Sequence, residues 1–197
     1  MMKKNFFVIL VVLLFMGCFT VLGFGQKESE SNTDSAGNSS KADVTYPPKG
    51  WVTDIREAYR IAQKENKMIF VDFTGSDWCV WCKRLDAEVF SESEFKEYAE
   101  KNLVLLFVDS PSGIELSSEQ IRHNQLLAQI LGVKGYPTIW LFGSDLSPLL
   151  STGYQRGGAA EYIRHLEEDR PSISKEQSDD FKASFKKAIE DNLGKLE

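Results

Sequence analysis

Trp78-Cys79-Val80-Trp81-Cys82-Lys83 is the stretch that decides the fold of this chain. It follows an apolar run, Met68 to Phe73, and precedes residues with a helical pattern of apolar positions. Two cysteines separated by two residues at the start of a helix can close a disulfide and reopen it. The partial positive charge of the helix N-terminus favours a thiolate over a thiol. A Cys-x-x-Cys between a strand and a helix therefore indicates a dithiol/disulfide centre.

The other cysteine and the histidines exclude competing uses of this pair. The chain has three cysteines, and the third, Cys18, lies in the N-terminal segment. A structural zinc site would need two more ligands at short spacing. The two histidines, His123 and His165, are far apart, and we expect both at the surface. Haem attachment needs histidine where Lys83 stands. An inert disulfide is disfavoured because so short a loop gains little entropy. Disulfide exchange, which needs no bound cofactor or metal, is therefore the favoured chemistry.

Residues 1–25 have the pattern of a secretory signal peptide, with two lysines ahead of an apolar run from Phe6 to Met16. Two alternatives stay open. Apolar character continues to Phe24, which suits an uncleaved membrane anchor, and Cys18 could be the lipidated residue of a lipoprotein. All three forms export the domain. We therefore expect a periplasmic or exported protein whose only membrane contact is its N-terminal segment.

Composition divides the rest of the chain. Residues 26–43 are polar and form a predicted flexible linker, because they cannot bury enough apolar surface to offset chain entropy. Residues 44–170 are predicted to form one domain, and residues 171–197 a C-terminal helical extension after a helix-stopping proline. The net charge of −6 argues against nucleic acid as a partner.

Apolar periodicity predicts the order of helices and strands. The first helix is expected to begin at a cap, Thr53 or Asp54, with Glu57 completing a capping box. The predicted helices cover about 54–66, 79–90 (with 91–101 as its continuation or a second segment), 117–131, 158–168 and 175–193, and the predicted strands cover 69–73, 103–108, 138–142 and 148–152.

Buried strands that alternate with helices predict right-handed crossovers and a parallel core. The tight connection between the last two strands predicts that these two are antiparallel. The sequence thus indicates an α/β domain with a central sheet covered on both faces.

The combination of motifs resembles the thioredoxin superfamily over about Trp51 to Glu168. The resemblance rests on Phe70-Val71-Asp72-Phe73, on the Cys-x-x-Cys, on Gly135-Tyr136-Pro137-Thr138 before a strand and on Gly153 after the last strand. It implies a thioredoxin-like fold with a mixed sheet, and the extra C-terminal helix lies outside it. Phe73 to Cys79 is one residue longer than in ordinary thioredoxin and is closer to exported relatives that include the C-terminal domain of DsbD. The connection Ser110 to Ser118 is also longer.

Three residues are the candidate catalytic groups. We expect Cys79, at the helix start, to be the more exposed cysteine and the nucleophile. Cys82, one turn further, is expected to resolve the mixed disulfide. Asp72 interrupts an apolar strand, so burial should raise the pKa of its carboxyl. The resemblance implies that Asp72 takes the proton of Cys82. A buried acid with a purely structural role is the alternative.

Four residues are the candidate substrate-binding groups. Trp78 and Trp81 flank the cysteines and can form an apolar docking surface for a client, although either could instead fill the core. The resemblance implies that Pro137 is a cis-proline facing the disulfide. It also implies that the backbone of Tyr136 pairs with the substrate.

These residues predict an exported thiol:disulfide oxidoreductase that exchanges disulfides with client proteins. Strongly oxidising relatives place histidine where this chain has Trp81, so the sequence favours a reductant or electron relay, recharged by a membrane donor of the DsbD type. A disulfide oxidase or isomerase is the alternative, since Gly135 to Thr138 resembles that region of disulfide isomerases. A non-catalytic binding module of the same fold is a third.

Overall fold

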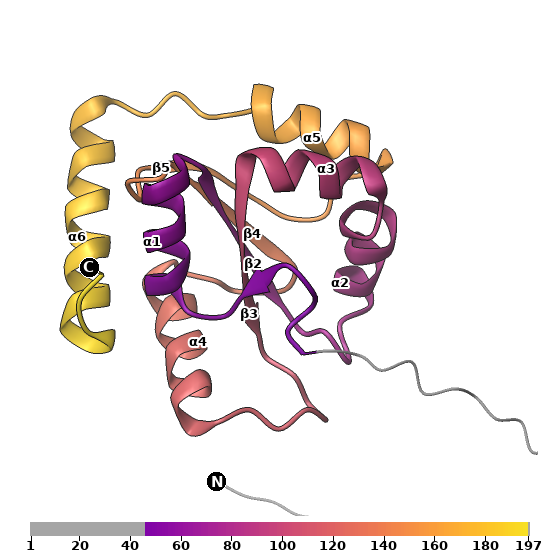
Figure 1. Ribbon diagram of the computed structural model, residues 1–197, viewed down its shortest axis with the longest axis horizontal. Helices are drawn as coiled ribbons and strands as arrows, with labels where there is room; N and C mark the ends of the chain where they lie inside the picture. Colours follow the sequence, from indigo (N-terminus) through magenta and orange to yellow (C-terminus); the bar gives the residue numbers. More distant parts are fainter. Residues whose placement is uncertain (1–45, 197) are drawn as a thin grey trace, which may run out of the picture. The chain divides into compact units, whose positions relative to one another are not determined.

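The computed structural model describes residues 46–196, so the predicted leader and linker lie outside the described residues (Figure 1). Its centre is a five-stranded sheet with the order β1-β3-β2-β4-β5. The strands are β1 (Trp51–Val52), β2 (Met68–Thr74), β3 (Leu103–Asp109), β4 (Thr138–Phe142) and β5 (Pro148–Thr152). The last four were predicted to within a residue or two, but β1 was missed because two residues are too short to show a period.

Strand direction departs from the predicted parallel core at one place. β1, β3 and β2 are mutually parallel, but β4 is antiparallel to β2 as well as to β5. The register explains this: Thr74 pairs with Asp109, and Phe73 pairs with Thr138. The chain therefore leaves β3 and enters β4 at the same end of the sheet. The predicted mixed sheet is confirmed, with its parallel part limited to three strands.

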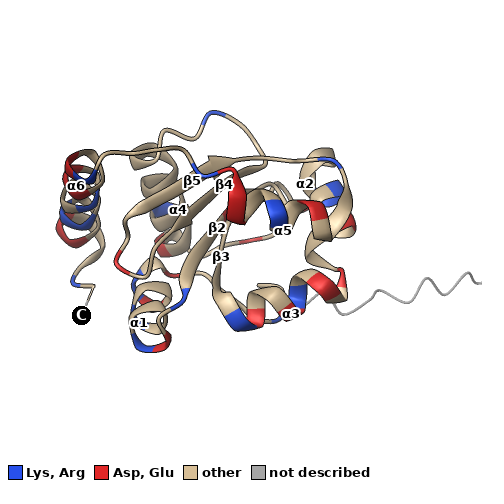
Figure 2. Cartoon of the chain, turned by 90° about the horizontal axis from the view of Figure 1, so that it is seen from above, with Lys and Arg blue, Asp and Glu red and all other residues tan. Residues whose placement is uncertain are grey.

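Helices cover both faces of this sheet, as predicted. Seen from above, α1, α4 and α6 lie on one side and α2, α3 and α5 on the other (Figure 2). The helices are α1 (Ile55–Glu65), α2 (Val80–Leu85), α3 (Ser93–Asn102), α4 (Ser118–Ile130), α5 (Gly158–Glu168) and α6 (Lys175–Leu193). None of the helices within residues 46–196 is long and apolar enough to cross a membrane.

A π-helical turn, η1 (Asp86–Phe90), directly follows α2. Its wider spacing lets both Val89 and Phe90, neighbours in sequence, point into the core. π-Helical turns often occur at functional sites, and this one begins at an acidic residue beside the cysteines.

The boundaries of α1 follow from its capping residues. Asp54 is the N-cap, and its carboxylate accepts the Arg56 amide rather than closing the predicted capping box with Glu57. The helix ends at Asn66, which has a left-handed backbone with φ of 52°. Asparagine tolerates that conformation better than most residues.

Alternating side chains of the strands build two cores. In β2, Ile69, Val71 and Phe73 face α1, α4 and α6, whereas Phe70 faces the opposite helices. Full burial of such a side chain is worth roughly 1.5–3 kcal/mol. The same alternation directs Asp72 toward α2, and this places an acid beneath the cysteines.

The C-terminal extension belongs to the same core as the domain before it. Phe185 and Ile189 of α6 are buried against the face that α1 and α4 cover. Phe185 also stacks on Phe142 of β4, with ring centroids 5.2 Å apart. Removing α6 would therefore expose the part of this face that Phe142 of β4 contributes.

Candidate active site

The cysteine pair forms a disulfide at the start of α2. Cys79 and Cys82 are bonded, with their Cα atoms 5.2 Å apart. Cys79 is the N-cap of α2, and its Sγ accepts the backbone N–H of Cys82 at 3.2 Å. A donor aimed at this sulfur, together with the helix N-terminus, stabilises negative charge on Cys79 when the bond opens. This geometry supports Cys79 as the attacking sulfur.

The expected difference in exposure between the two cysteines is not present in this oxidised form. Cys79 is 6% exposed and Cys82 is 5% exposed. Each is covered because the bond ties the sulfur of Cys79 to that of a residue on the inner face of α2. Position at the helix start, rather than exposure, distinguishes the two thiols.

Asp72 is buried, and one of its carboxylate oxygens, Oδ1, has no hydrogen-bond partner among the described residues. Burial raises the pKa of this carboxyl well above its usual value, and the negative charges of Asp109 and Asp86 raise it further. A carboxyl with a raised pKa takes up a proton more readily than an exposed one and can then transfer it. The predicted buried acid is thus present, with the predicted direction of its pKa shift.

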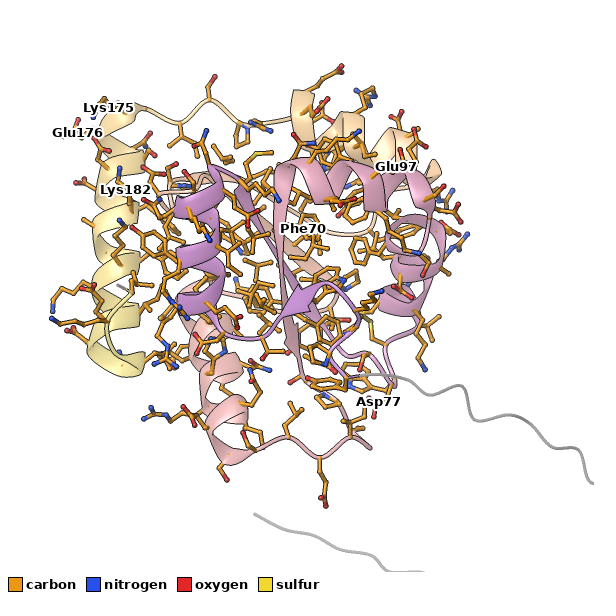
Figure 3. The ribbon with its side chains drawn as sticks, viewed as in Figure 1. Phe70, Asp77, Glu97, Lys175, Glu176 and Lys182 are labelled. Carbon is orange, nitrogen blue, oxygen red and sulfur yellow. A yellow bond between two sulfur atoms is a disulfide. The ribbon has the colours of Figure 1, made fainter. Side chains whose placement is uncertain are left out.

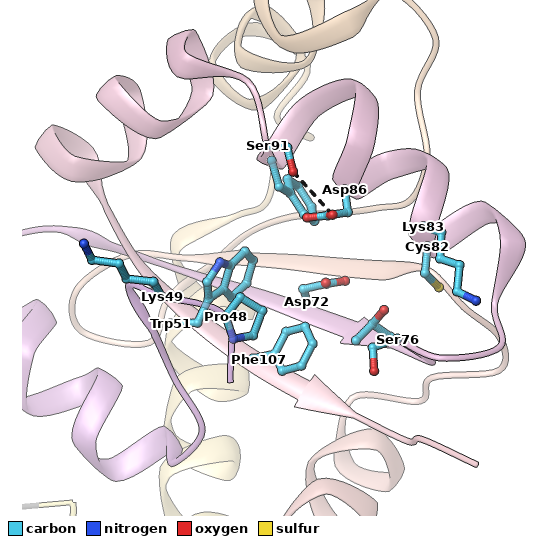
Figure 4. Close-up of a pocket in the computed structure, with 12 residues that line it drawn as sticks. Pro48, Lys49, Trp51, Asp72, Ser76, Cys82, Lys83, Asp86, Ser91 and Phe107 are labelled. Carbon is cyan, nitrogen blue, oxygen red and sulfur yellow. Dashed lines mark hydrogen bonds between the residues drawn. The ribbon is translucent and has the colours of Figure 1, made fainter. Parts of the chain in front are cut away.

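A cavity of about 430 Å³ connects Asp72 with Cys82 (Figure 4). Lys83, Asp86 and Ser76 also contribute to its wall. Its aromatic part is formed by Trp51, Phe90 and Phe107. Because the acid and the second cysteine line the same cavity, a proton can pass between them through it.

The exposed side of the disulfide is aromatic. Trp78 and Trp81 are each 49% exposed, so neither fills the core. The rings of Trp78 and Tyr136 form a T-shaped pair with centroids 5.8 Å apart, and the ring of Trp81 lies 5.3 Å from that of Tyr154. The two tryptophans therefore sit in two separate aromatic pairs, neither of which lines the Asp72 cavity.

Tyr154 is a site residue that the sequence did not indicate. Its hydroxyl donates to Glu88, which also accepts from Arg84. The Arg84 guanidinium lies 5.6 Å from the ring centre of Trp81 and 5.5 Å from that of Tyr154. The positive charge of Arg84 is thus engaged by a carboxylate and two rings.

The loop before β4 holds the remaining predicted residues. The Tyr136–Pro137 peptide bond is cis. Gly153 comes so close to this loop that an added Cβ would lie 3.1 Å from the carbonyl oxygen of Pro137. Glycine at that position therefore allows the end of β5 to approach the loop.

His123 is buried, contrary to the predicted surface position, because it lies on the inner face of α4. Its Nε2 accepts the backbone N–H of Ile55 at the start of α1. Burial lowers the pKa of its imidazole, which favours the neutral form needed for that bond. His165 is half-buried and contacts Thr152 and Asp169.

Residues 50–144 match the family model described as thioredoxin-like. With the Cys-x-x-Cys at the start of α2 and the mixed sheet, this match identifies the fold of the matched residues. Residues 50–144 form a thioredoxin-like domain. The predicted resemblance and fold are confirmed, and the chain has a thioredoxin fold of the thiol-disulfide oxidoreductase type with a Cys79–Cys82 disulfide.

Two curated relatives and one solved structure are similar to this chain. Disulfide bond reductase DsbH of Chlamydia pneumoniae is 34% identical over 107 residues, which are 54% of this chain and 64% of that protein. Thiol:disulfide interchange protein DsbD of Yersinia pestis is 27% identical over 118 residues, 58% of this chain but 18% of DsbD. A solved structure of a DsbH oxidoreductase has a TM-score of 0.56 at 29% identity, covering 62% of this chain and 88% of that one. The chain therefore spans less than two thirds of these curated relatives.

Proposed function

We propose that this protein is an exported thiol:disulfide oxidoreductase that reduces disulfides of client proteins. The observation that carries the proposal is the Cys79–Cys82 disulfide at the start of α2, whose second cysteine shares a cavity with the buried Asp72. Two of its relatives, a disulfide bond reductase and a thiol:disulfide interchange protein, are named for this chemistry.

The first step begins from the reduced protein. The thiolate of Cys79 attacks one sulfur of the client disulfide, so a mixed disulfide forms and the other client sulfur leaves as a thiolate. The Cys82 amide, which points at the Cys79 sulfur, and the helix N-terminus stabilise the attacking charge. The exposed rings of Trp78 and Trp81, with Tyr136, form the surface on which the client segment rests.

The second step releases the client. Cys82 gives its proton to the Asp72 carboxylate through their shared cavity, and its thiolate then attacks the Cys79 sulfur. The client's second sulfur leaves as a thiolate, and the protein retains the disulfide seen in the structure. The client gains two electrons and the protein loses two.

A dithiol donor must return those electrons. When the donor opens the disulfide, Asp72 gives its proton back to the leaving sulfur of Cys82. A membrane donor of the DsbD type is the proposed source, and the predicted signal or lipid anchor would place the domain on the same side of the membrane. The leader lies in residues outside the described part of the chain.

The direction of electron flow rests on what surrounds Cys79. Trp81 offers no cation to a Cys79 thiolate, and the neighbouring Arg84 is paired with Glu88. Lys83 donates to the carbonyl oxygen of Asp77. The reduced state thus lacks the extra stabilisation that makes a protein strongly oxidising.

Equilibration of the Cys79–Cys82 pair with glutathione tests this function. We expect a potential near the thioredoxin value, about −270 mV, and reduction of insulin disulfides that Cys79→Ser abolishes. A potential above about −170 mV would instead indicate an oxidase, because it lies above the isomerase value of about −180 mV and toward the DsbA value of about −120 mV. A protein that reduces no disulfide at all would be a binding module.

A further inference from the structure

Several hydrogen bonds join two loops at the end of the sheet, and the exchange reaction described above uses none of them. One is the segment Thr74–Trp78, which leads from β2 into α2, and the other is Asp109–Gly113, which follows β3. The stretches Phe73 to Cys79 and Ser110 to Ser118, in which most of these residues lie, are longer than their counterparts in ordinary thioredoxin. We refer to these two segments and the bonds between them as the clasp.

The clasp begins where the two strands end. The amide of Ser110 donates to the carbonyl oxygen of Thr74 at 2.9 Å. Ser76 donates its amide to Asp109 Oδ1 at 2.9 Å and its hydroxyl to Asp109 Oδ2. Asp109 is itself buried, and its carbonyl oxygen accepts a hydrogen bond from the side-chain amide of Asn124 in α4. This half of the clasp is therefore anchored in the core.

Asp77 supplies the other half. It lies at the end of the sheet where β2 and β3 finish (Figure 3). Its carboxylate accepts the backbone amides of Ser112, at 2.9 and 3.0 Å, and of Gly113. These bonds lower the pKa of Asp77 and keep it charged. Lys83 of α2 donates to its carbonyl oxygen at 2.6 Å.

Trp78 is held by this arrangement although half of its surface is exposed. Its indole Nε1–H donates to the carbonyl oxygen of Ser110 at 2.8 Å. The ring lies on Gly75, where an added Cβ would be 2.4 Å from the indole. An exposed aromatic ring that is fixed before binding loses less entropy when a partner arrives.

We propose that Asp77 is a positioning residue. Its hydrogen bonds with the Ser112 and Gly113 amides hold Trp78 in place, and Trp78 forms one wall of the client-docking surface. The inference rests on the proposed function, since it concerns the client that the disulfide serves. It adds that the loop after β3, which does not include either cysteine, determines how well a protein client binds. A client with an apolar side chain beside its disulfide would use this wall.

The test compares Asp77→Ala with Asp180→Ala, an exposed acid of α6 outside the clasp. With dithiothreitol as donor, we expect Asp77→Ala to raise KM for insulin at least about fivefold, the effect of losing a moderate contact. We expect its kcat with insulin and its rate with a small aryl disulfide to stay within about twofold of the wild-type values. Its reduction potential should be unchanged, because Cys79 keeps its surroundings. Asp77→Asn, which retains an acceptor oxygen, should restore most of the affinity.

Equal losses with insulin and with the small disulfide would overturn the proposal, since they would show altered thiol reactivity rather than docking. An unchanged KM would also overturn it.

Amide exchange tests the clasp independently of activity. In Asp77→Ala the amides of Ser112 and Gly113 should exchange at least about tenfold faster, as expected when a local bond is lost, and the Trp78 indole N–H resonance should shift, while amides of α6 stay the same. If both signals are unchanged, Asp77 does not hold this loop and Trp78 in place, and the proposal is refuted whatever the activity of the variant. If both signals change but the wild-type protein reduces no insulin, the proposed function is refuted, while the role of Asp77 in holding Trp78 is confirmed.

Discussion

Replacing Asp72 by asparagine should stabilise the oxidised protein increasingly as the pH rises. Asp72 is buried, its Oδ1 has no partner among residues 46–196, and its pKa is raised well above the usual value by burial and then by Asp109 and Asp86. Lys49 and Lys83 are the positive groups that line the same cavity. Between the unfolded and the folded pKa of Asp72, the folded state therefore keeps a proton on this carboxyl that the unfolded chain has released.

The sign follows from proton linkage. Below the unfolded pKa of about 3.9 both states are protonated, and the carboxyl costs nothing extra. As the pH rises from there to the native pKa, the wild type loses about 1.4 kcal/mol of unfolding free energy per pH unit through this group. Above the native pKa the loss is complete and stays constant. Asp72→Asn has no such loss, and any cost of burying the amide is a fixed offset.

Urea unfolding of the oxidised protein from about pH 4 upward measures this difference. The gap in unfolding free energy between Asp72→Asn and wild type should widen with pH and then level off at the native pKa. Asp180→Asn, on the exposed face of α6, should run parallel to the wild type. A gap that is flat over this range, or that narrows as the pH rises, would refute the assignment of Asp72 as an acid with a raised pKa.

Three further outcomes are expected. Cys82→Ser should accumulate mixed disulfides with client proteins, whereas Cys79→Ser should trap almost none; equal trapping on non-reducing gels would contradict the assigned roles. Trp81→His should raise the potential measured against glutathione by at least about 30 mV, or about 1.4 kcal/mol, and no change would count against the reductant argument. Phe185→Ala should cost about 3–5 kcal/mol in urea unfolding because it empties a site between α6 and β4. Phe181→Ala, at a half-buried position, should cost less, and a Phe185 variant as stable as wild type would show that α6 is not part of the core.

Local pattern was enough to predict most elements. The strands at 69–73 and 138–142, and the helix at 175–193, were found because apolar period and capping residues are properties of neighbouring residues. Interpretation failed where the signal was short or non-local. β1 has two residues, and the buried position of His123 depends on contact with α1, 68 residues earlier in the chain.

The candidate site divides in the same way. The two cysteines, Asp72 and the flanking tryptophans were named from the sequence because each stands in a motif that is read along the chain. Tyr154 and Asp109 were not named. Each acts through partners that the fold brings to it, among them Trp81 for Tyr154 and Ser76 for Asp109.

The sequence by itself determined that a dithiol pair begins a helix after a buried strand that carries an acid, since periodicity and spacing are local. Only the tertiary structure decided what surrounds that pair. Asp72 and Cys82 share a cavity because strand alternation turns the acid toward α2. Asp77 accepts hydrogen bonds from amides 35 and 36 residues away because parallel β2 and β3 end at the same edge of the sheet. Backbone donors carry no residue-specific signal, so contacts of this kind appear only when the chain is folded.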